Sequence, residues 1–549
     1  MSLHPQTPYS IPEETARVAH AIFPQGNIYM RWFDALGPVF QDADFVELFP
    51  SDGQPALSPA CLTLVLPLQF AEGLSDRQAA DAVRTRIDWK YLLGLELTDP
   101  GFDFSVLSEF RQRLLEHQWE EHLLDQLLRH LRDQGLLKAR GQQRTDSTII
   151  LGAVRDLNRL EVIGETLRHA LEQLATVMPE WTRAHTPSTW VDRYGTRVQD
   201  YRLPSGQAQR EAYAEGIGAD GASLLQAIYA PDAPAWLREL PAVQLVRRVW
   251  LQNYTGRGDG RLRWRQVDEL PPAAQRIRSP YDAEVRYCTK RETGWIGYKI
   301  HLTETCDADS PRIITQVETT LATTADGKMT TPIHQALQQK DLLPAAHLVD
   351  TGYLDAELLV TSQTEYGVNL VGPTRHDTGW QSHDGGNGFA ATDFQIDWEK
   401  QQARCPAGKL SQFWTPAINN HGTAVIQIKF AKRDCRACPT QLQCTHSTPP
   451  RRTVTVRPQA HQHALKIART REQTAAFKEQ YAQRSGIEGT LSYGVRSFAL
   501  RRTRYLGLAK THLQHLLIAT AMNVMRVVRW LAGEPFTQVR PTAFAPASN

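Results

Sequence analysis

The feature that most constrains the fold is a series of strand-like segments within residues 136–374. The run KARGQQRTDSTIILGAV turns toward β-branched residues and predicts a strand with Asp146 near its centre. WIGYKIHLTETC and PRIITQVETTLAT predict two more strands, joined by a turn at residues 307–310. A helix over residues 332–340 then leads into AAHLVDTGY, a short apolar strand that ends in Asp350, and VNLVGP is one more strand. Strands interleaved with a helix predict an α/β domain.

Other stretches of the chain differ in composition and in hydrophobic pattern. Residues 26–135 are patterned as helices, and residues 155–279 predict a helical insertion after the strand of Asp146. Residues 375–449 are rich in Gly, Asn and Thr and hold four of the seven cysteines, which predicts a second insertion. Residues 1–25 are punctuated by proline and predict a loose arm, whereas the Pro-rich residues 531–549 predict a disordered tail.

Two amphipathic helices in the amino-terminal region flank a short turn that contains Gly73. Ser75 or Asp76 can cap the second of these helices. A helix-turn-helix-like unit that reads DNA ends has this pattern, and so does a plain helical bundle. The pattern leaves both interpretations open.

The segment from Gln480 to Lys510 sets a lone carboxylate among basic residues. Its spacing places Tyr481, Arg484 and Glu488 on one stripe of a helix, although an Arg–Glu pair four residues apart also fits an ordinary surface ion pair. From residue 451 to 530 there are fifteen Lys or Arg and three acidic residues, a local charge of +12, so against the total of +2 the rest of the chain carries −10. This asymmetry indicates a phosphate-binding face.

The two residues between Tyr481 and Arg484 and the three between Arg484 and Glu488 resemble the Tyr-Arg-Glu-Lys signature of DDE insertion-sequence transposases. The family lysine would fall at Val495, and Arg496 stands beside that position. By arrangement of motifs, the resemblance covers roughly residues 57–529.

This resemblance implies an α/β catalytic core, a ribonuclease-H-like mixed sheet flanked by helices, built from residues 136–374 and 450–530. It also implies that the helical domain of residues 26–135 serves DNA binding and dimerisation. Double-stranded DNA, both the transposon ends with their inverted repeats and the target, is the implied partner. Because two ends are synapsed, a homodimer is expected.

Two aspartates and one glutamate hold two divalent metals in such transposases. Asp146, Asp350 and Glu488 match them here and would hold two Mg²⁺ or Mn²⁺ ions, which prefer carboxylate oxygens. The implied chemistry is DNA strand cleavage followed by 3′-hydroxyl strand transfer. Considered alone, Asp350 is equally well interpreted as the cap of a helix at residues 354–359.

The expected DNA contacts are basic and aromatic side chains. Lys299 and His301 lie on the polar face of their strand and would point outward near the site, which an ordinary solvated strand face explains nearly as well. The full set is Tyr481, Arg484, Arg496, Lys299, His301, Arg501, Arg502, Arg504 and Lys510.

The second insertion predicts a structural zinc site from Cys405, Cys435, Cys438 and Cys444, two of which form a CxxC pair. His421 or His446 could replace one ligand, and four reduced, buried cysteines are the alternative. An odd total of seven cysteines favours free thiols or metal ligands in a reducing cytosol over a disulfide framework.

The chain contains no run of about 18 apolar residues and no signal-like amino terminus, so a cytoplasmic protein without membrane contact is expected. Two other functions fit the same motifs. One is a ribonuclease-H-like nuclease that cuts DNA without strand transfer, and the other is a non-catalytic DNA-binding protein derived from a transposase.

Overall fold

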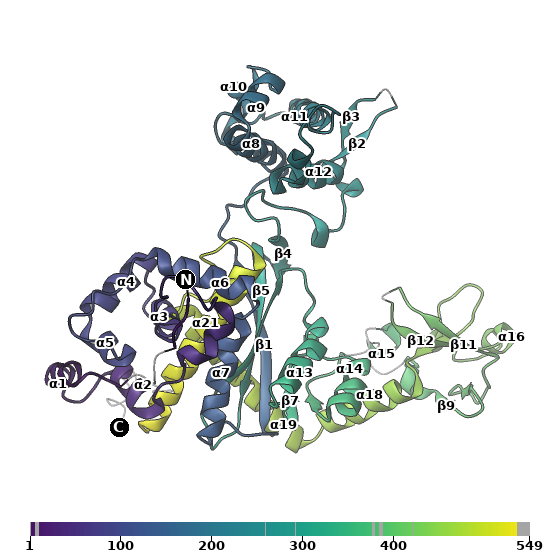
Figure 1. Ribbon diagram of the computed structural model, residues 1–549. Helices are drawn as coiled ribbons and strands as arrows, with labels where there is room; N and C mark the ends of the chain where they lie inside the picture. Colours follow the sequence, from purple (N-terminus) through teal and green to yellow (C-terminus); the bar gives the residue numbers. More distant parts are fainter. Residues whose placement is uncertain are drawn as a thin grey trace, which may run out of the picture.

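A mixed β-sheet lies at the centre of the protein, and three groups of elements surround it (Figure 1). The structure is a computed structural model that describes residues 2–5, 10–258, 260–290, 292–375, 379–383, 388–420 and 422–534. His421 and residues 535–549 of the expected disordered tail therefore lie outside the described residues. Helices from both ends of the chain cover one side of the sheet, residues 155–279 form a lobe that stands apart, and the cysteine-bearing residues lie at the far end.

The sheet has the strand order β6-β5-β1-β7-β8, and β4 also pairs with β5. Strand β1 is antiparallel to β5 and parallel to β7, β5 is antiparallel to β6, and β7 is parallel to β8. This mixed α/β arrangement is compatible with a ribonuclease-H-like core. The strands are β1 (Gln142–Leu151), β4 (Arg286–Lys290), β5 (Thr293–Thr305), β6 (Ile314–Leu321), β7 (Ala346–Leu348) and β8 (Asn369–Val371).

Both faces of the sheet are covered by helices, which explains why its strands are rich in buried β-branched residues. On one face, His347 of β7 contacts His334 of α13 (Thr330–Gln339), and α14 (Ala356–Tyr366) follows the same side. On the other face, Glu304 of β5 accepts hydrogen bonds from Thr490 of α20 (Gly486–Ser497) and Arg526 of α21 (Leu508–Leu531).

Helix α21 joins the sheet to the amino-terminal helices. It packs against β6 on one side and against α2, α3 and α7 on the other, and its side chains from Leu513 to Val528 are buried. One contiguous apolar core therefore runs from the amino-terminal helices through α21 into the sheet. No helix among the described residues is long and apolar enough to cross a membrane.

The amino-terminal region differs from expectation at two points. Helix α1 occupies residues 13–22, where a loose arm was predicted, because Ala19 packs with Met30 and Tyr91. Of the two helices flanking Gly73, α3 is almost entirely buried, and only α4 has an exposed face. The helices are α1 (Glu13–Ile22), α2 (Ile28–Leu36), α3 (Pro59–Ala71), α4 (Asp76–Thr85), α5 (Ile87–Leu93), α6 (Ser105–Glu116) and α7 (Glu120–Asp133).

Residues 155–279 fold into a mainly helical lobe with its own apolar core, which includes Leu167, Ile217 and Trp250. Its elements are α8 (Arg159–Val177), α9 (Pro179–His185), α10 (Trp190–Tyr194), α11 (Gln207–Ile228), α12 (Pro241–Asn253) and the hairpin of β2 (Tyr254–Gly256) and β3 (Leu262–Trp264).

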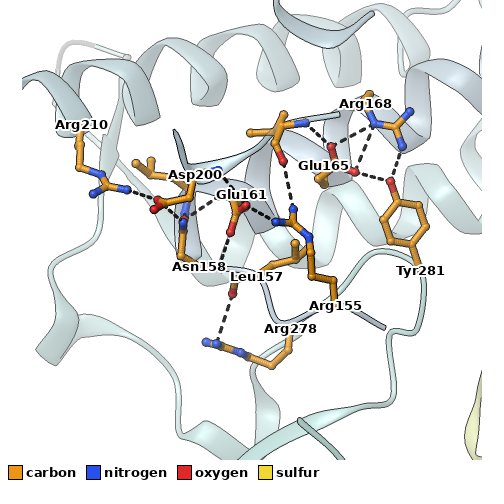
Figure 2. A network of polar contacts seen from close by, with 12 residues as sticks. Arg155, Leu157, Asn158, Glu161, Glu165, Arg168, Asp200, Arg210, Arg278 and Tyr281 are labelled. Atoms are coloured by element: carbon orange, nitrogen blue, oxygen red, sulfur yellow. Dashed lines mark hydrogen bonds and ion pairs between the residues drawn. The ribbon is translucent and has the colours of Figure 1, made fainter. Parts of the chain in front are cut away.

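A polar network fastens both chain segments that join this lobe to the sheet (Figure 2). Glu161 of α8 accepts a 2.8 Å hydrogen bond from Arg155, on the segment that enters the lobe. Glu165, one turn later, accepts a hydrogen bond from Tyr281, on the segment that leaves it. Two carboxylates of one helix thereby hold both connections in place.

The cysteine-bearing residues form a small β-rich lobe around Phe394, Ile428 and Phe430. Its third antiparallel strand, β13, extends the lobe beyond residue 449, the expected boundary. Its elements are β9 (Gln395–Asp397), β10 (Gln402–Arg404), β11 (Phe413–Ile418), β12 (Ala424–Lys429), α16 (Lys432–Arg436), α17 (Gln441–Cys444) and β13 (Thr453–Val456), followed by α18 (Gln459–Glu472) and α19 (Ala475–Ala482).

Candidate active site

The sheet register brings Asp146 and Asp350 to neighbouring positions. The last parallel pair of β1 and β7 is Arg144 with Leu348, so two further residues along each chain lead to Asp146 and Asp350. Just after β7, Asp350 accepts a 2.8 Å hydrogen bond from the backbone N–H of Gly352 and turns the chain. Asp350 thus caps the short 3₁₀ turn η7 (Thr351–Tyr353), whereas Asp355 caps α14.

Arg484 lies between the two aspartates and Glu488. Its Nη2 is 2.8 Å from Asp146 Oδ2 and 3.9 Å from Asp350 Oδ2, and its Nη1 is 3.4 Å from Glu488 Oε1. Because the first two distances start at one nitrogen, the two aspartate oxygens are no farther apart than their sum. Two strands and a helix therefore bring three carboxylates to one guanidinium.

The exposure of the three carboxylates increases from Asp146 through Asp350 to Glu488. The side chain of Asp146 is 15% exposed, that of Asp350 38% and that of Glu488 67%. Burial raises the pKa of Asp146, while the charges of Arg484 and Lys290 and the backbone N–H of Ser147 lower it and Asp350 raises it. An extended polyanion can therefore approach from the side of Glu488.

Tyr481 lies beside this group on α19. Its ring stacks on Phe477 with centroids 5.5 Å apart, and burial raises the pKa of its hydroxyl. The charges of Arg484 and the three carboxylates also act on that hydroxyl, so it lies within their electrostatic reach. The residue is half-buried and can present its hydroxyl to a bound ligand.

Lys299 and His301 do not point toward this group. Residues paired across antiparallel strands share a face, and these two pair with Ile149 and Ser147, on the face of β1 opposite to Asp146. His301 is 1% exposed, its Nδ1 is 2.5 Å from Tyr353 Oη, and burial lowers its pKa to about 4. The expectation that His301 projects outward to contact DNA is therefore wrong, because helices cover both faces of the sheet.

Most of the other expected DNA contacts are exposed. Arg501 donates a 3.0 Å hydrogen bond to Thr148, which shares the face of β1 with Asp146. Arg504 donates to the carbonyl of Leu74 in the amino-terminal helices, so part of its donor capacity is already used. The exposed residues of the expected set are Arg496, Arg501, Arg502, Arg504 and Lys510.

Two polar residues near the site were not singled out from the sequence. Asp326 accepts a 3.0 Å hydrogen bond from Lys299, and Lys290 at the end of β4 acts electrostatically on Asp146. A carboxylate just after a predicted strand was the available signal for Asp326. The position of Lys290 follows from the β4–β5 hairpin, which was not predicted from the sequence.

Cys405, Cys435, Cys438 and Cys444 line one cavity of about 380 Å³ in the β-rich lobe. The sulfur of Cys405 accepts a hydrogen bond from the backbone N–H of Lys409, and burial raises the pKa of Cys444 to about 11. Across the described ranges, however, no three His, Cys, Asp or Glu side chains are arranged so that they could hold a metal ion. The guanidinium of Arg484 lies between the carboxylate oxygens of Asp146 and Glu488.

Two protein-family models match parts of the chain. Residues 404–528, which include Arg484 and Glu488, match the family model described as a transposase DDE domain. Residues 17–113 match the model of a transposase domain, DUF772. Together these two matches support a DDE insertion-sequence transposase. Asp146 and Asp350 lie outside both matched segments, and no curated protein matches the chain.

Proposed function

We propose that the protein is a transposase that cleaves DNA at the inverted repeats that end its element and joins the freed 3′-hydroxyl to target DNA. The observation that carries the proposal is the contact of Arg484 with Asp146, Asp350 and Glu488. Such a group suits phosphodiester chemistry, because it combines acidic oxygens for metal ions with a cation for phosphate. Since two element ends must be held together, we also propose that the active form is a homodimer.

The three carboxylates supply the oxygen donors that the divalent ions of this chemistry prefer, and they would have to rearrange around Arg484 to hold the ions, because the described residues form no ready metal site. Carboxylate oxygens are the ligands that Mg²⁺ and Mn²⁺ prefer, and the guanidinium of Arg484 marks a place where a positive charge is stable. Two bound Mg²⁺ or Mn²⁺ ions would activate the attacking oxygen and stabilise the leaving oxygen. Asp146, Asp350 and Glu488 would hold them.

Arg484 and Tyr481 would position the DNA. The guanidinium, once free of the carboxylates, can donate to a phosphate beside the cleaved bond, and the half-buried hydroxyl of Tyr481 can do the same. Exposed Arg496, Arg501 and Arg502 would hold the backbone further along without reading sequence. Reading of the inverted repeats would require other elements, and the exposed face of α4 supports a role for the amino-terminal helices.

We propose separately that the four cysteines of the β-rich lobe hold one structural Zn²⁺. They line one cavity and come from separate segments of the chain, as ligands of a structural zinc site do. The sulfurs would have to draw closer around the ion. Elemental analysis should find about one zinc per chain in the purified protein and less in Cys438→Ser, with Cys288→Ser as the control; equal zinc in both variants would contradict the site.

The test of the main proposal compares Glu488→Gln with Glu479→Gln, a matched change at an exposed residue of α19. Glu488→Gln should bind DNA that carries the element's ends but neither cut nor join it in Mg²⁺, because a metal ligand is lost while the basic residues remain. Glu479→Gln should both cut and join this DNA. Normal cleavage by Glu488→Gln would contradict the assignment.

The same assay separates the alternative functions. An intact protein that cuts the ends but never joins a 3′-hydroxyl to target DNA would be a nuclease. One that binds the ends without cutting in Mg²⁺ or Mn²⁺ would be a non-catalytic DNA-binding protein.

A further inference from the structure

Asp326 lies on the opposite side of the sheet from Arg484 and contacts the neighbours of both aspartates. It begins the 3₁₀ turn η6 (Asp326–Lys328), between β6 and α13. Its Oδ1 accepts hydrogen bonds from Lys299 Nζ at 3.0 Å and from Ser147 Oγ at 3.2 Å. Lys299 also donates to the carbonyl of Thr324 at 2.8 Å, which fixes its ammonium group over the turn.

The contact with Ser147 connects Asp326 to Asp146. Ser147 follows Asp146 in β1, and its backbone N–H donates a 2.8 Å hydrogen bond to Asp146 Oδ1. The hydroxyl and the N–H of one residue thus bind the two carboxylates, which lie on opposite sides of the strand. A shift of Ser147 would therefore move the carboxylate of Asp146.

The second oxygen of Asp326 faces Asp350 across a glycine. A Cβ atom on Gly352 would stand 3.3 Å from Asp326 Oδ2 and 3.0 Å from Asp350 Oδ1. The two oxygens are therefore no farther apart than the sum of those distances. A Cβ on Gly327 would stand 3.0 Å from the carbonyl oxygen of Gly352, so η6 and η7 pack closely at these two glycines.

Tyr353 holds the second turn on the same side. Its hydroxyl contacts His301, and its carbonyl accepts a 2.7 Å hydrogen bond from Thr330 of α13. Ser147 also hydrogen-bonds the Tyr353 hydroxyl, so η7 is tied to β1 both directly and through Asp326 of η6. Asp326 is the residue of η6 that hydrogen-bonds Ser147 of β1 and Lys299 of β5.

We propose that Asp326 is a positioning residue of the catalytic centre, which with Lys299 sets the places of Asp146 and Asp350 for metal binding. The inference rests on the proposed function, because it concerns the same carboxylates. Partners that orient metal ligands typically change metal affinity by roughly 10- to 100-fold when they are removed. Asp326 would act through Ser147 and Gly352 and would not itself touch the reacting phosphate.

The measurement is the affinity of the full-length protein for Mn²⁺, determined from the electron paramagnetic resonance signal of the free ion. Asp326→Asn should weaken binding by roughly 10-fold or more while circular dichroism and melting temperature stay near those of the unmodified protein. Asp355→Asn is the control, since it removes a nearby acidic charge and Asn caps a helix as well as Asp does.

Lys299→Met separates positioning from a simple effect of charge. If Asp326 acted only through its negative field, removing the neighbouring positive charge would strengthen Mn²⁺ binding. If Asp326 positions the ligands, Lys299→Met should weaken binding, because Asp326 loses its main donor. Ser147→Ala should weaken binding as well, and it tests the same connection if Asp326→Asn does not fold.

Unchanged Mn²⁺ affinity in Asp326→Asn, or tighter binding by Lys299→Met, would overturn the inference while leaving the proposed function intact. A protein whose Mn²⁺ binding does not depend on Asp146, Asp350 or Glu488 would instead overturn the proposed function and this inference with it.

Discussion

At the scale of single residues, the guanidinium of Arg484 places a positive charge among the carboxylates where the proposed reaction requires metal cations. Arg484 is 14% exposed and compensates carboxylates that would otherwise repel one another. A divalent cation between the same oxygens would make this compensation unnecessary. Occupation by metal and by the guanidinium should therefore compete.

Replacing Arg484 with Ala should lower the free energy of unfolding by about 1–3 kcal/mol in EDTA, because a partly buried carboxylate loses its charged partner. Mg²⁺ should restore part of this stability, since an ion that binds only the folded state stabilises it. Urea unfolding with EDTA and with Mg²⁺ measures both effects. Arg496→Ala, an exposed change on α20, is the control; equal stabilisation of the two variants by Mg²⁺ would contradict the competition.

Buried histidines give the core a dependence on pH. Burial lowers the pKa of His301 and of His334 to about 4, and lowers the pKa of His347 well below its ordinary value of 6.5. Because the folded state disfavours their protonation, the stability they contribute is present above pH 6.5 and is lost as pH falls toward 4. Each unit of pKa shift corresponds to about 1.4 kcal/mol.

We expect the free energy of unfolding to fall between pH 6.5 and 5, before most carboxylates titrate. His334→Gln should flatten this slope, and His117→Gln, at an exposed position, should not. Urea unfolding at several pH values in this window tests the prediction. A stability that stays level or rises as pH falls would show that these histidines are protonated in the folded protein.

At the scale of secondary-structure elements, close helix packing holds the helical lobe together. The indole N–H of Trp250 on α12 donates a 2.9 Å hydrogen bond to the carbonyl of Gly218 on α11. One turn further along α11, a Cβ on Gly221 would overlap the Trp250 ring. The two helices approach this closely because glycine leaves the space free.

Gly221→Ala should therefore destabilise the lobe by about 1–3 kcal/mol through overpacking. Gly216→Ala lies in the same helix with nothing within 4 Å of the added Cβ, and it should stabilise by about 0.5–1 kcal/mol because alanine favours a helix. Thermal unfolding of the two variants compares them directly. The same destabilisation in both would mean that packing against Trp250 is not what distinguishes these positions.

At the scale of the whole molecule, part of the excess positive charge of residues 451–530 lies along the strand that carries Asp146. The chain around Arg501 and Arg502 runs alongside the end of β1, where the N–H of Leu151 donates to the carbonyl of Arg501 at 2.8 Å. The basic residues of the carboxyl-terminal segment are thus brought to the strand that carries Asp146.

Replacing Arg496, Arg501 and Arg502 together with Gln should weaken binding to all duplexes about equally. The slope of log affinity against log salt should become shallower by about 0.9 for each phosphate that the variant no longer neutralises. Filter binding across a salt series measures it. The control is the same change at Arg183, Arg197 and Arg247, exposed residues of the helical lobe; an unchanged slope in the first variant would place the DNA elsewhere.

The order of elements and the residue types of the site follow from the sequence. Strand β1 around Asp146, the strand ending before Asp350 and the spacing of Tyr481, Arg484 and Glu488 are local patterns, because side-chain periodicity depends on neighbours a few residues away. The signature around Glu488 indicated the transposase family before any contact was known.

Only the tertiary structure decided which side chains face one another. The sequence does not reveal that His301 is buried against Tyr353 or that Asp326 contacts both β1 and β5. Nor does it reveal that α21 joins the amino-terminal helices to the sheet in one core. Each of these depends on strand register and on helix packing between distant segments. Such contacts are fixed when the whole chain buries its apolar surface, and no local pattern records them.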